Sequence, residues 1–582
     1  MSTFAIQQDS KSAHTYFNSK KLMPMNTLQG LLFTVVAALP AAAMAQFAPR
    51  HTPGIMKKLP VAMEHPVNDT PEGTLHDNMA YANTYHYYGY DGEIENAESH
   101  AIITRYVMTP DSTIWWHNPI TMQDGGWVRI DHMGGGKYVM HTPQCIIEDE
   151  DNIDDEGNIY KAFATRLVLK NFGDGYYYYP DVDEDGHANL DLHFTLNEDG
   201  ELRQVNDSIV KDMDDMPYEV LALSNANGDW YGFSDGAMRV WRVNDQPTKL
   251  PEGIEPQRYV LTDSTLNQQT GRFSFTRQLI DMAIQGQDAY LAAPDGTGWI
   301  HGKITDDGSI CLRPQYIGPA KIYGSHVWFE PATFQIDYDN EATDDNDEEE
   351  DKQEPYELDY KLAPELVLHK TADGAYAADY PAALLINATK GQVLYAADYP
   401  VPSLTTFTEK PAVPATPKIT EFYPYYEEDG SALFTVRIPV YDQNKEMLDP
   451  TLLSYVVYVN DDKEPYTFLP EDYQALTEPM TELSYWFNDG YDFSITDIGH
   501  TIYLYMDAER VGVQSIYRGA GEERRSDIGW DDGSVTTGLK SATTTKRIDS
   551  IYDIQGRKLQ HLTQGVNIVR MTDGTTKKII KR

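Results

Sequence analysis

The chain has 582 residues, of which 90 are acidic and 46 basic, which gives a formal net charge of -44. This charge nearly excludes a general nucleic-acid binder, because phosphate binding needs clustered lysine and arginine to release counterions. Hydrophobic residues make up 41% and charged residues 23%, so the chain is neither disordered throughout nor a polytopic membrane protein. At roughly 100–200 residues per domain, we expect about three to five domains.

Residues 1–45 have the pattern of a leader with a signal peptide. A Lys-Lys pair precedes an apolar stretch over 28–43, and an Ala-Met-Ala site ends it before Gln46. A basic start, a short apolar core and an A-x-A site are typical of secretory signal peptides. A transmembrane anchor is the alternative, but the apolar run is short and contains polar and helix-breaking residues. We therefore expect export, cleavage before Gln46, no transmembrane anchor afterwards, and a linker over 46–70.

Short motifs recur in the same order along the next part of the chain. The recurring pairs are Pro71-Glu72-Gly73 with Pro251-Glu252-Gly253, Gly126-Trp127-Val128 with Gly298-Trp299-Ile300, Pro143-Gln144 with Pro314-Gln315, and 192–200 with 366–374. Their similar spacing predicts a tandem duplication, with β-rich repeat 1 over 71–250 and β-rich repeat 2 over 251–402. Cys145 and Cys311 lie in different units, so we expect two free thiols or at most one bridge between the units.

Within each unit, apolar and polar residues alternate. The clearest case is the run Leu190-Asp191-Leu192-His193-Phe194-Thr195-Leu196. This period of two is that of a half-buried strand, and Asp-Gly and Asn-Gly pairs separate such runs as they do in hairpins. The pattern predicts an all-β fold in which each unit is an antiparallel sandwich or a small barrel.

Serine, threonine and proline mark a linker over 403–418, and strand patterns return over 419–530. The strongest are 434–440, 455–459, 502–506 and 511–517. About seven strands in a segment of this length are typical of an immunoglobulin-type sandwich. The last run, with the turn 518–521 and Ser526-Asp527-Ile528 after it, resembles the final hairpin of fibronectin type III domains. This resemblance implies a spacer role for the sandwich.

Residues 531–547 are a second predicted linker, and 548–582 carry the most specific motifs of the chain. These are Tyr552-Asp553-Ile554-Gln555-Gly556-Arg557, Gly565-Val566-Asn567-Ile568-Val569 and a lysine-rich end. The segment resembles the C-terminal sorting domains of type IX secretion cargo in Bacteroidota, with Asn567 where an aromatic residue is commoner. The resemblance implies Sec export, passage across the outer membrane through the secretion machinery, and cell-surface attachment or release. The whole chain resembles multidomain surface proteins of gut or oral Bacteroidota.

One acidic loop suggests a calcium site. Its candidate ligands are Asp181, Asp183, Asp185, His187 and Asn189. Carboxylates at alternate positions before a glycine let oxygens converge on Ca²⁺, and the spacing resembles the first half of EF-hand and dockerin loops. Leu192 stands at the twelfth position, where those loops carry an acidic residue. A solvated acidic hairpin is therefore the alternative.

Aromatic clusters offer flat faces for sugar rings. The candidates are Tyr85, Tyr87, Tyr88, Tyr90, the run 176–179 and Trp115-Trp116. Tyrosine is also favoured within strands, so packing across strands is the alternative for each cluster. Trp127 and Trp299 recur in both units, which favours a role in the core.

Other polar motifs indicate little chemistry. The acidic runs 148–156 and 344–351 are typical of solvated insertion loops. Gly134-Gly135-Gly136-Lys137 lacks the glycine spacing and the hydroxyl residue of a phosphate loop, and His132 and His141 beside it have no recognisable third metal ligand. The sequence has no zinc-helix or serine-elbow motif.

These patterns favour an exported protein, extracellular or on the outer cell surface, with a non-catalytic binding or structural role. An adhesin-like or glycan-binding function of the duplicated units is the leading hypothesis. Calcium is its candidate cofactor, and glycans or host surface proteins are its candidate partners. A secreted carbohydrate-active enzyme with its site in the duplicated region is the alternative, and a self-assembling surface component is a third hypothesis.

Overall fold

The computed structural model describes residues 59–88, 94–121, 123–153, 159–171, 176–183, 185–210, 216–268, 270–338, 356–426, 430–460, 462–496, 498–536, 548–553, 557–559, 565–571 and 576–581. The predicted leader lies outside these residues. The chain divides into two compact units, Met1–Thr408 and Glu409–Arg582. Within the described residues, the helical segments are two 3-10 turns, Lys321–Tyr323 and Pro450–Leu452. No helix in this part of the chain is long and apolar enough to cross a membrane.

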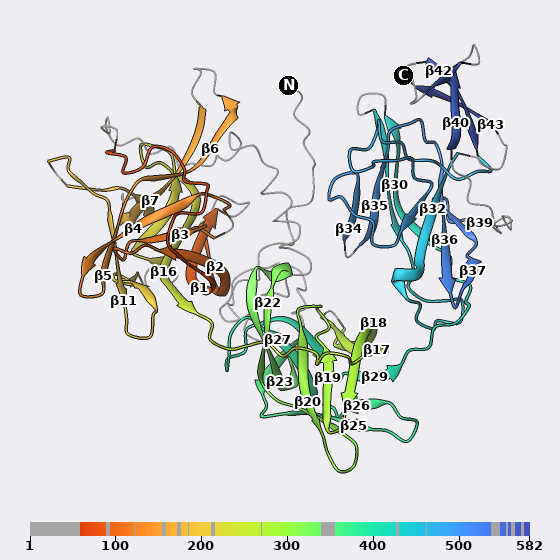
Figure 1. Ribbon diagram of the computed structural model, residues 1–582, viewed down its shortest axis with the longest axis horizontal. Helices are drawn as coiled ribbons and strands as arrows, with labels where there is room; N and C mark the ends of the chain where they lie inside the picture. Colours follow the sequence, from red (N-terminus) through yellow and green to blue (C-terminus); the bar gives the residue numbers. More distant parts are fainter. Residues whose placement is uncertain are drawn as a thin grey trace, which may run out of the picture. The chain divides into compact units, whose positions relative to one another are not determined.

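The first unit begins with a closed antiparallel barrel, called barrel 1 (Figure 1). Its strands, in order around the barrel, are β1 (Thr74–Tyr88), β2 (Ile94–Met108), β3 (Ile114–His117), β4 (Trp127–Gly134), β5 (Lys137–His141), β11 (Asp191–Leu196), β12 (Leu202–Gln204) and β16 (Trp230–Arg242). Each strand pairs with the next, and β16 pairs with β1 to close the circuit. Tyr81, Trp116 and Phe194 belong to the buried cluster inside it.

A second closed barrel, called barrel 2, follows in the same unit. Its strands are β17 (Gln257–Asn267), β18 (Arg272–Gln285), β19 (Asp288–Ala292), β20 (Trp299–Ile304), β21 (Ile310–Leu312), β25 (Leu366–Lys370), β26 (Tyr376–Ala378) and β29 (Ser403–Thr406). The strands follow one another around the barrel in chain order, as they do in barrel 1. The structure therefore confirms the predicted all-β fold with two tandem barrels.

Both barrels are interrupted at the same two places. After the fifth barrel strand, the chain forms β6 (Gln144–Ile153), β7 (Ile159–Asn171), β8 (Tyr176–Tyr179), β9 (Asp181–Val182) and β10 (Ala188–Asn189) in repeat 1, and β22 (Gln315–Ala320), β23 (Ser325–Tyr338) and β24 (Tyr356–Leu362) in repeat 2. After the seventh, it forms β13 (Ile209–Val210), β14 (Met216–Pro217) and β15 (Glu219–Ser224), or β27 (Ala382–Asn387) and β28 (Tyr395–Pro400). In both repeats the longest inserted strand pairs across to the second insertion, β7 with β15 and β23 with β27.

The recurring sequence motifs occupy equivalent places in the two barrels. Trp127 begins β4 and Trp299 begins β20, while Gln144 begins β6 and Gln315 begins β22. Each glutamine accepts the backbone N–H of the residue two positions after the tryptophan and donates to the carbonyl of the same residue, at 2.7–2.8 Å. These bonds extend the strand ladder past the last backbone pairs of β4–β5 and β20–β21. The repeated glutamines therefore serve the fold.

The second unit contains a two-sheet sandwich. One sheet has the order β30 (Lys418–Tyr426), β31 (Ser431–Arg437), β35 (Gly499–Leu504) and β34 (Phe493–Thr496); the other has β33 (Glu482–Ser484), β32 (Leu453–Val459), β36 (Val511–Gly519), β38 (Ile528–Trp530) and β39 (Val535–Thr536), with β37 (Glu522–Arg525) paired to β36. Side chains of both sheets, such as Phe434 and Val513, share one buried cluster, as expected for a sandwich. A separate sheet has the order β41 (Lys558–Leu559), β40 (Ile548–Asp553), β42 (Gly565–Met571) and β43 (Thr576–Lys581).

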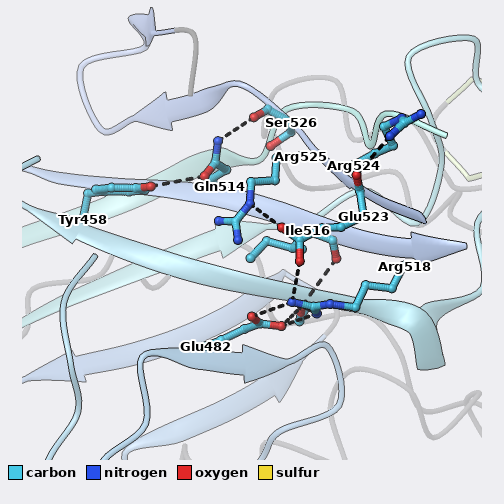
Figure 2. A network of polar contacts seen from close by, with 10 residues as sticks. Tyr458, Glu482, Gln514, Ile516, Arg518, Glu523, Arg524, Arg525 and Ser526 are labelled. Carbon is cyan, nitrogen blue, oxygen red and sulfur yellow. Dashed lines mark hydrogen bonds and ion pairs between the residues drawn. The ribbon is translucent and has the colours of Figure 1, made fainter. Parts of the chain in front are cut away.

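A charged network ties the hairpin β36–β37 to the sandwich (Figure 2). Arg518 forms ion pairs with Glu482 of β33 and with Glu523 of β37, and Arg525 pairs with Glu523 at 2.9 Å. Each carboxylate of this network has a guanidinium partner, so its charges hold strands together and leave no open anion or cation site there.

Segments predicted as linkers contain ordered backbone. Ser403–Thr406, at the start of the linker predicted over 403–418, is the last strand of barrel 2. Met63 and Val67, in the linker predicted over 46–70, form β-bridges to Gln144 of β6 and Trp127 of β4. Val535–Thr536 pairs with β38, inside the linker predicted from 531. In each case, polar and proline-containing sequence is held by pairing with a neighbouring strand, which composition alone does not reveal.

Candidate ligand-binding site

Backbone pairing joins the two barrels. Ile102 of β2 pairs with Ser325 of β23, and the N–H of Ile103 donates to the carbonyl of Gly324 at 2.7 Å. His326 lies beside this junction and is 1% exposed. Its Nε2–H donates to the Met79 carbonyl at 3.0 Å, since a carbonyl can only accept. Burial lowers the pKa of this histidine, so it bridges the barrels as a neutral group.

An apolar layer lies between the barrels. It contains Ala80, Ala101, Val243, Tyr316 and Trp328, with Trp241 packed against it. The phenol of Tyr316 donates to Nδ1 of His326 at 2.7 Å, which leaves Nε2 of that ring to carry the proton. Ala101 has a φ of 49° at a bulge in β2, a left-handed backbone that is uncommon for a non-glycine residue.

A cavity of about 330 Å³ opens over this layer. Its apolar lining consists of Ala101, Trp241, Val243 and Trp328. Its polar lining consists of Arg242, Asn244, Asp245, Thr389 and Lys390. Small-molecule pockets of about 300–1,000 Å³ typically combine aromatic walls with a few convergent polar groups, and this cavity lies at the lower end of that size range. Strands β2 and β16 and the segment after β16 supply the lining up to Asp245, and the inserted segments of repeat 2 supply the rest, with Trp328 in β23 and Thr389 and Lys390 in the turn after β27.

Hydrogen bonds fix the walls of this cavity, called the inter-barrel cleft. Nε1 of Trp328 donates to Oδ2 of Asp245 at 3.2 Å, and Nζ of Lys390 donates to the same oxygen at 3.2 Å. The ring of Trp328 also lies 5.3 Å from that of Tyr316. Trp328 is 5% exposed, so it forms the base of the cleft, whereas the half-buried Trp241 forms a wall.

The residues predicted to bind calcium lie in one hairpin, β9–β10, where the carboxylates of Asp181 and Asp183 have protein partners. Asp181 approaches Arg166 at 3.3 Å and Lys170 at 3.7 Å. Oδ1 of Asp183 accepts the backbone N–H groups of Asp185 and His187 at 3.0 and 2.8 Å, and the latter bond lowers the pKa of Asp183. No group of three or more His, Cys, Asp or Glu side chains suited to a metal occurs among the described residues, which omit Glu184. The calcium site therefore stays a prediction.

The aromatic residues singled out in the sequence mostly pack within strands. Trp116 is buried and donates to Thr104 at 2.9 Å, and Tyr178 is buried and donates to the Pro217 carbonyl at 2.8 Å. Tyr85 and Tyr87 are half-buried, and their rings stack with centres 5.9 Å apart. Tyr176, Tyr177 and Tyr179 are also half-buried. The side chains of Tyr88 and Tyr90 lie outside the described residues. Trp127 is buried, which confirms its predicted role in the core. Trp299 is only half-buried, so it belongs to the core in part.

The remaining predicted motifs also find structural roles. His141 contacts Asp191 at 2.7 Å, and the ring of His132 lies 5.0 Å from that of Tyr138. Glu148 of the first acidic run pairs with Lys161 at 2.9 Å, whereas the run 344–351 lies outside the described residues. Both cysteines are free, so the alternative of an inter-repeat bridge is wrong.

Sequence reasoning missed Trp241 and Trp328. The signal that could have identified them is that neither tryptophan has a tryptophan at the corresponding position of the other repeat. Trp241 pairs opposite Ala80, and the corresponding pair in barrel 2, 180 positions after Ala80, is Val260 opposite Thr405. No family model matches the chain, and no curated protein matches its sequence, so the chemistry of the inter-barrel cleft has to be deduced from its own residues.

Proposed function

We propose that the chain is an exported, non-catalytic glycan-binding protein that holds a sugar in the inter-barrel cleft. The observation that carries this proposal is the pairing of two tryptophans, Trp241 and Trp328, with convergent polar side chains around a cavity of about 330 Å³. An indole ring presents a large, rigid face against which the C–H face of a sugar can lie. Asn244, Thr389 and Lys390 supply donors and acceptors for hydroxyl groups.

The chemistry of the cleft supports binding over hydrolysis. Glycosidases generally need two carboxyl groups about 5–10 Å apart on either side of the scissile bond. Among the described residues that line the cleft, the carboxylate is Asp245, and it is held by Lys390 and by the indole of Trp328. A carboxylate fixed by two donors is a positioning group for the walls and lacks a partner acid.

Substitution of the wall tryptophan tests the proposal. We expect Trp241→Ala to lower affinity at least about tenfold for any glycan that the full chain binds on a glycan array, because the stacking face is lost. Trp486→Ala is the matched control, since Trp486 lies in the other unit and is 59% exposed. Equal loss in both variants, or loss in the control alone, would place the binding site elsewhere. Melting curves of both variants establish that they are folded.

We also propose that 548–582 direct the chain through the outer-membrane type IX machinery. Support comes from the sequence motifs of this segment and from its compact four-stranded order β41-β40-β42-β43. The test is expression in a Bacteroidota host with and without these residues. We expect the truncated chain to accumulate inside the cells and the full chain to reach the surface or medium. Equal delivery of both chains would remove the sorting role.

A further inference from the structure

One strand of barrel 2 has an open edge. Strand β18 pairs with β17 over eleven residues, from Arg272 to Met282. On its other side it pairs with β19, but only from Met282 onward. Over 272–281 this second edge has no strand partner and no further backbone hydrogen bond among the described residues. Its outward-pointing N–H and C=O groups are therefore available to another strand.

This edge lacks the features that usually prevent edge-to-edge association. Natural edge strands are often short, or are interrupted by proline, a bulge or lysine. The register of β18 with β17 has no irregularity, and the sequence 268–280 contains no proline, lysine, aspartate or glutamate. Five of the six residues over 272–277 are exposed, and Phe275 is 72% exposed. A regular, exposed edge with an aromatic residue at its middle suits the addition of a further strand.

The charge of the edge is compatible with a second copy of this chain. The net charge of -44 opposes contact between copies, but exposed charges more than about 8 Å apart are largely screened at physiological ionic strength. Within 264–280 the charged residues are Arg272 and Arg277. Two copies of this edge therefore repel each other strongly only if these arginines lie opposite one another.

A two-fold antiparallel register keeps the arginines apart. When Phe275 lies opposite Phe275 of the second copy, Arg277 lies opposite Phe273 and Arg272 lies opposite Gln278. Phe273 is held in place by Phe334, whose ring centre is 5.9 Å away. Directly opposite side chains share one face of a sheet, where aromatic pairs and cations beside aromatic rings are favourable. The edge thus matches itself, as a two-fold interface requires.

We propose that the open edge of β18 joins two copies of this chain into a two-fold dimer, with Phe275 at its centre. The contact comprises the seven residues 272–278 of each copy, whereas stable interfaces use about 20–30 residues a side. The dimer is therefore reversible and forms as the concentration rises. None of the residues that line the inter-barrel cleft lies on β18, so this proposal is independent of sugar binding there.

Sedimentation velocity of the full chain at increasing concentration, in about 0.05 M and about 0.5 M salt, tests the dimer. We expect dimers to form, and to associate more tightly at the higher salt, because salt screens the repulsion between two acidic chains. Phe275→Lys places like charges opposite each other at the centre and should weaken association about tenfold or more. Ile284→Lys is the matched control, since Ile284 is an exposed residue of the same strand that already pairs with Ala289 of β19.

A cysteine variant tests the register. Directly opposite residues lie within reach of a disulfide, so Phe275→Cys should give a covalent dimer on oxidation, whereas Ile284→Cys and the unmodified chain should not. Melting curves establish that the variants are folded. A chain that stays monomeric at every concentration, or association that Phe275→Lys leaves unchanged, would overturn the proposal. Association that weakens as salt is added would also overturn it, because the edge would then bind an acidic surface.

Discussion

A buried carboxyl group in barrel 1 gives a sharp prediction of pH dependence. Asp235 of β16 is fully buried. Its Oδ2 accepts bonds from the phenol of Tyr81 at 2.7 Å and from the N–H and hydroxyl of Thr121 at 2.7 and 2.9 Å. Its Oδ1 has no partner among the described residues, and neither has Oδ1 of Asn83, although the side chain of Asn83 also interacts with Asp235. Asp235 thus keeps one buried acceptor without a donor among the described residues.

Burial raises the pKa of Asp235 from 3.8 to about 7. Because the folded-state pKa lies above the unfolded value, the folded state holds the proton more tightly. The stability that the protonated group contributes is fully present below about pH 4 and is lost as the pH rises to about 7. At about 1.4 kcal/mol per pH unit, the loss over this window is roughly 4 kcal/mol, of which about 3 kcal/mol falls above pH 5.

Replacement of Asp235 by asparagine should remove this dependence. The amide retains an acceptor for Tyr81 and Thr121, and its NH₂ supplies a donor where Oδ1 stood. Calorimetric unfolding of the full chain at pH 5 and pH 8 checks the prediction. We expect Asp235→Asn to resemble the unmodified chain at pH 5 and to be more stable by about 3 kcal/mol at pH 8.

The matched control is Asp207→Asn, an exposed aspartate paired with Arg203 at 2.7 Å, which should leave the pH dependence of the same transition unchanged. If Asp235→Asn were less stable than the unmodified chain at pH 8, the ionised carboxylate would be the form that the three donors stabilise. The reasoning from desolvation would then be wrong.

Two further predictions concern the fold and the acidic hairpin. Gln144→Ala should destabilise barrel 1 by about 2–4 kcal/mol in urea unfolding, because three side-chain bonds to backbone are lost from a residue that is 3% exposed. Gln315→Ala should cost less, since that glutamine is half-buried, and equal costs would contradict the burial argument. Calcium should leave the melting temperature unchanged, because Asp181 and Asp183 are already bonded; a rise with Ca²⁺ that Asp183→Ala abolishes would restore the calcium site.

The fold could be predicted from local sequence because its signals are local. Leu192 and Phe194 alternate with exposed His193 and Thr195 as the period of two requires. Gly200 and Gly374, in the recurring Asp-Gly turns, have φ of 82° and 86°, a conformation that glycine adopts without steric cost. Strand β29 was missed because a Ser-Leu-Thr-Thr run is short and polar, and its place depends on pairing with β17, which lies more than a hundred residues earlier.

The inter-barrel cleft could not be predicted in the same way, because its lining comes from β2, β16, β23 and the turn after β27. No motif spans such separations, and the tryptophans that recur in both repeats, Trp127 and Trp299, are not those that line the cleft. The positions that agree between the repeats, such as Gln144 and Gln315, hold the strand ladder. Functional residues in a duplicated protein are to be sought where the copies differ.

The cleft illustrates why that difference matters. Trp328 pairs opposite Tyr316 in β22–β23, and the corresponding pair in repeat 1 is Phe163 opposite Cys145. Each repeat therefore has an aromatic residue at this position, but only the one in repeat 2 is a tryptophan with an indole N–H. That N–H bonds to Asp245 in the segment that leaves barrel 1. Neither repeat alone supplies both tryptophans of the cleft. The segment after β16 and the inserted strand β23 therefore form the cleft together, one giving its wall and the other its base.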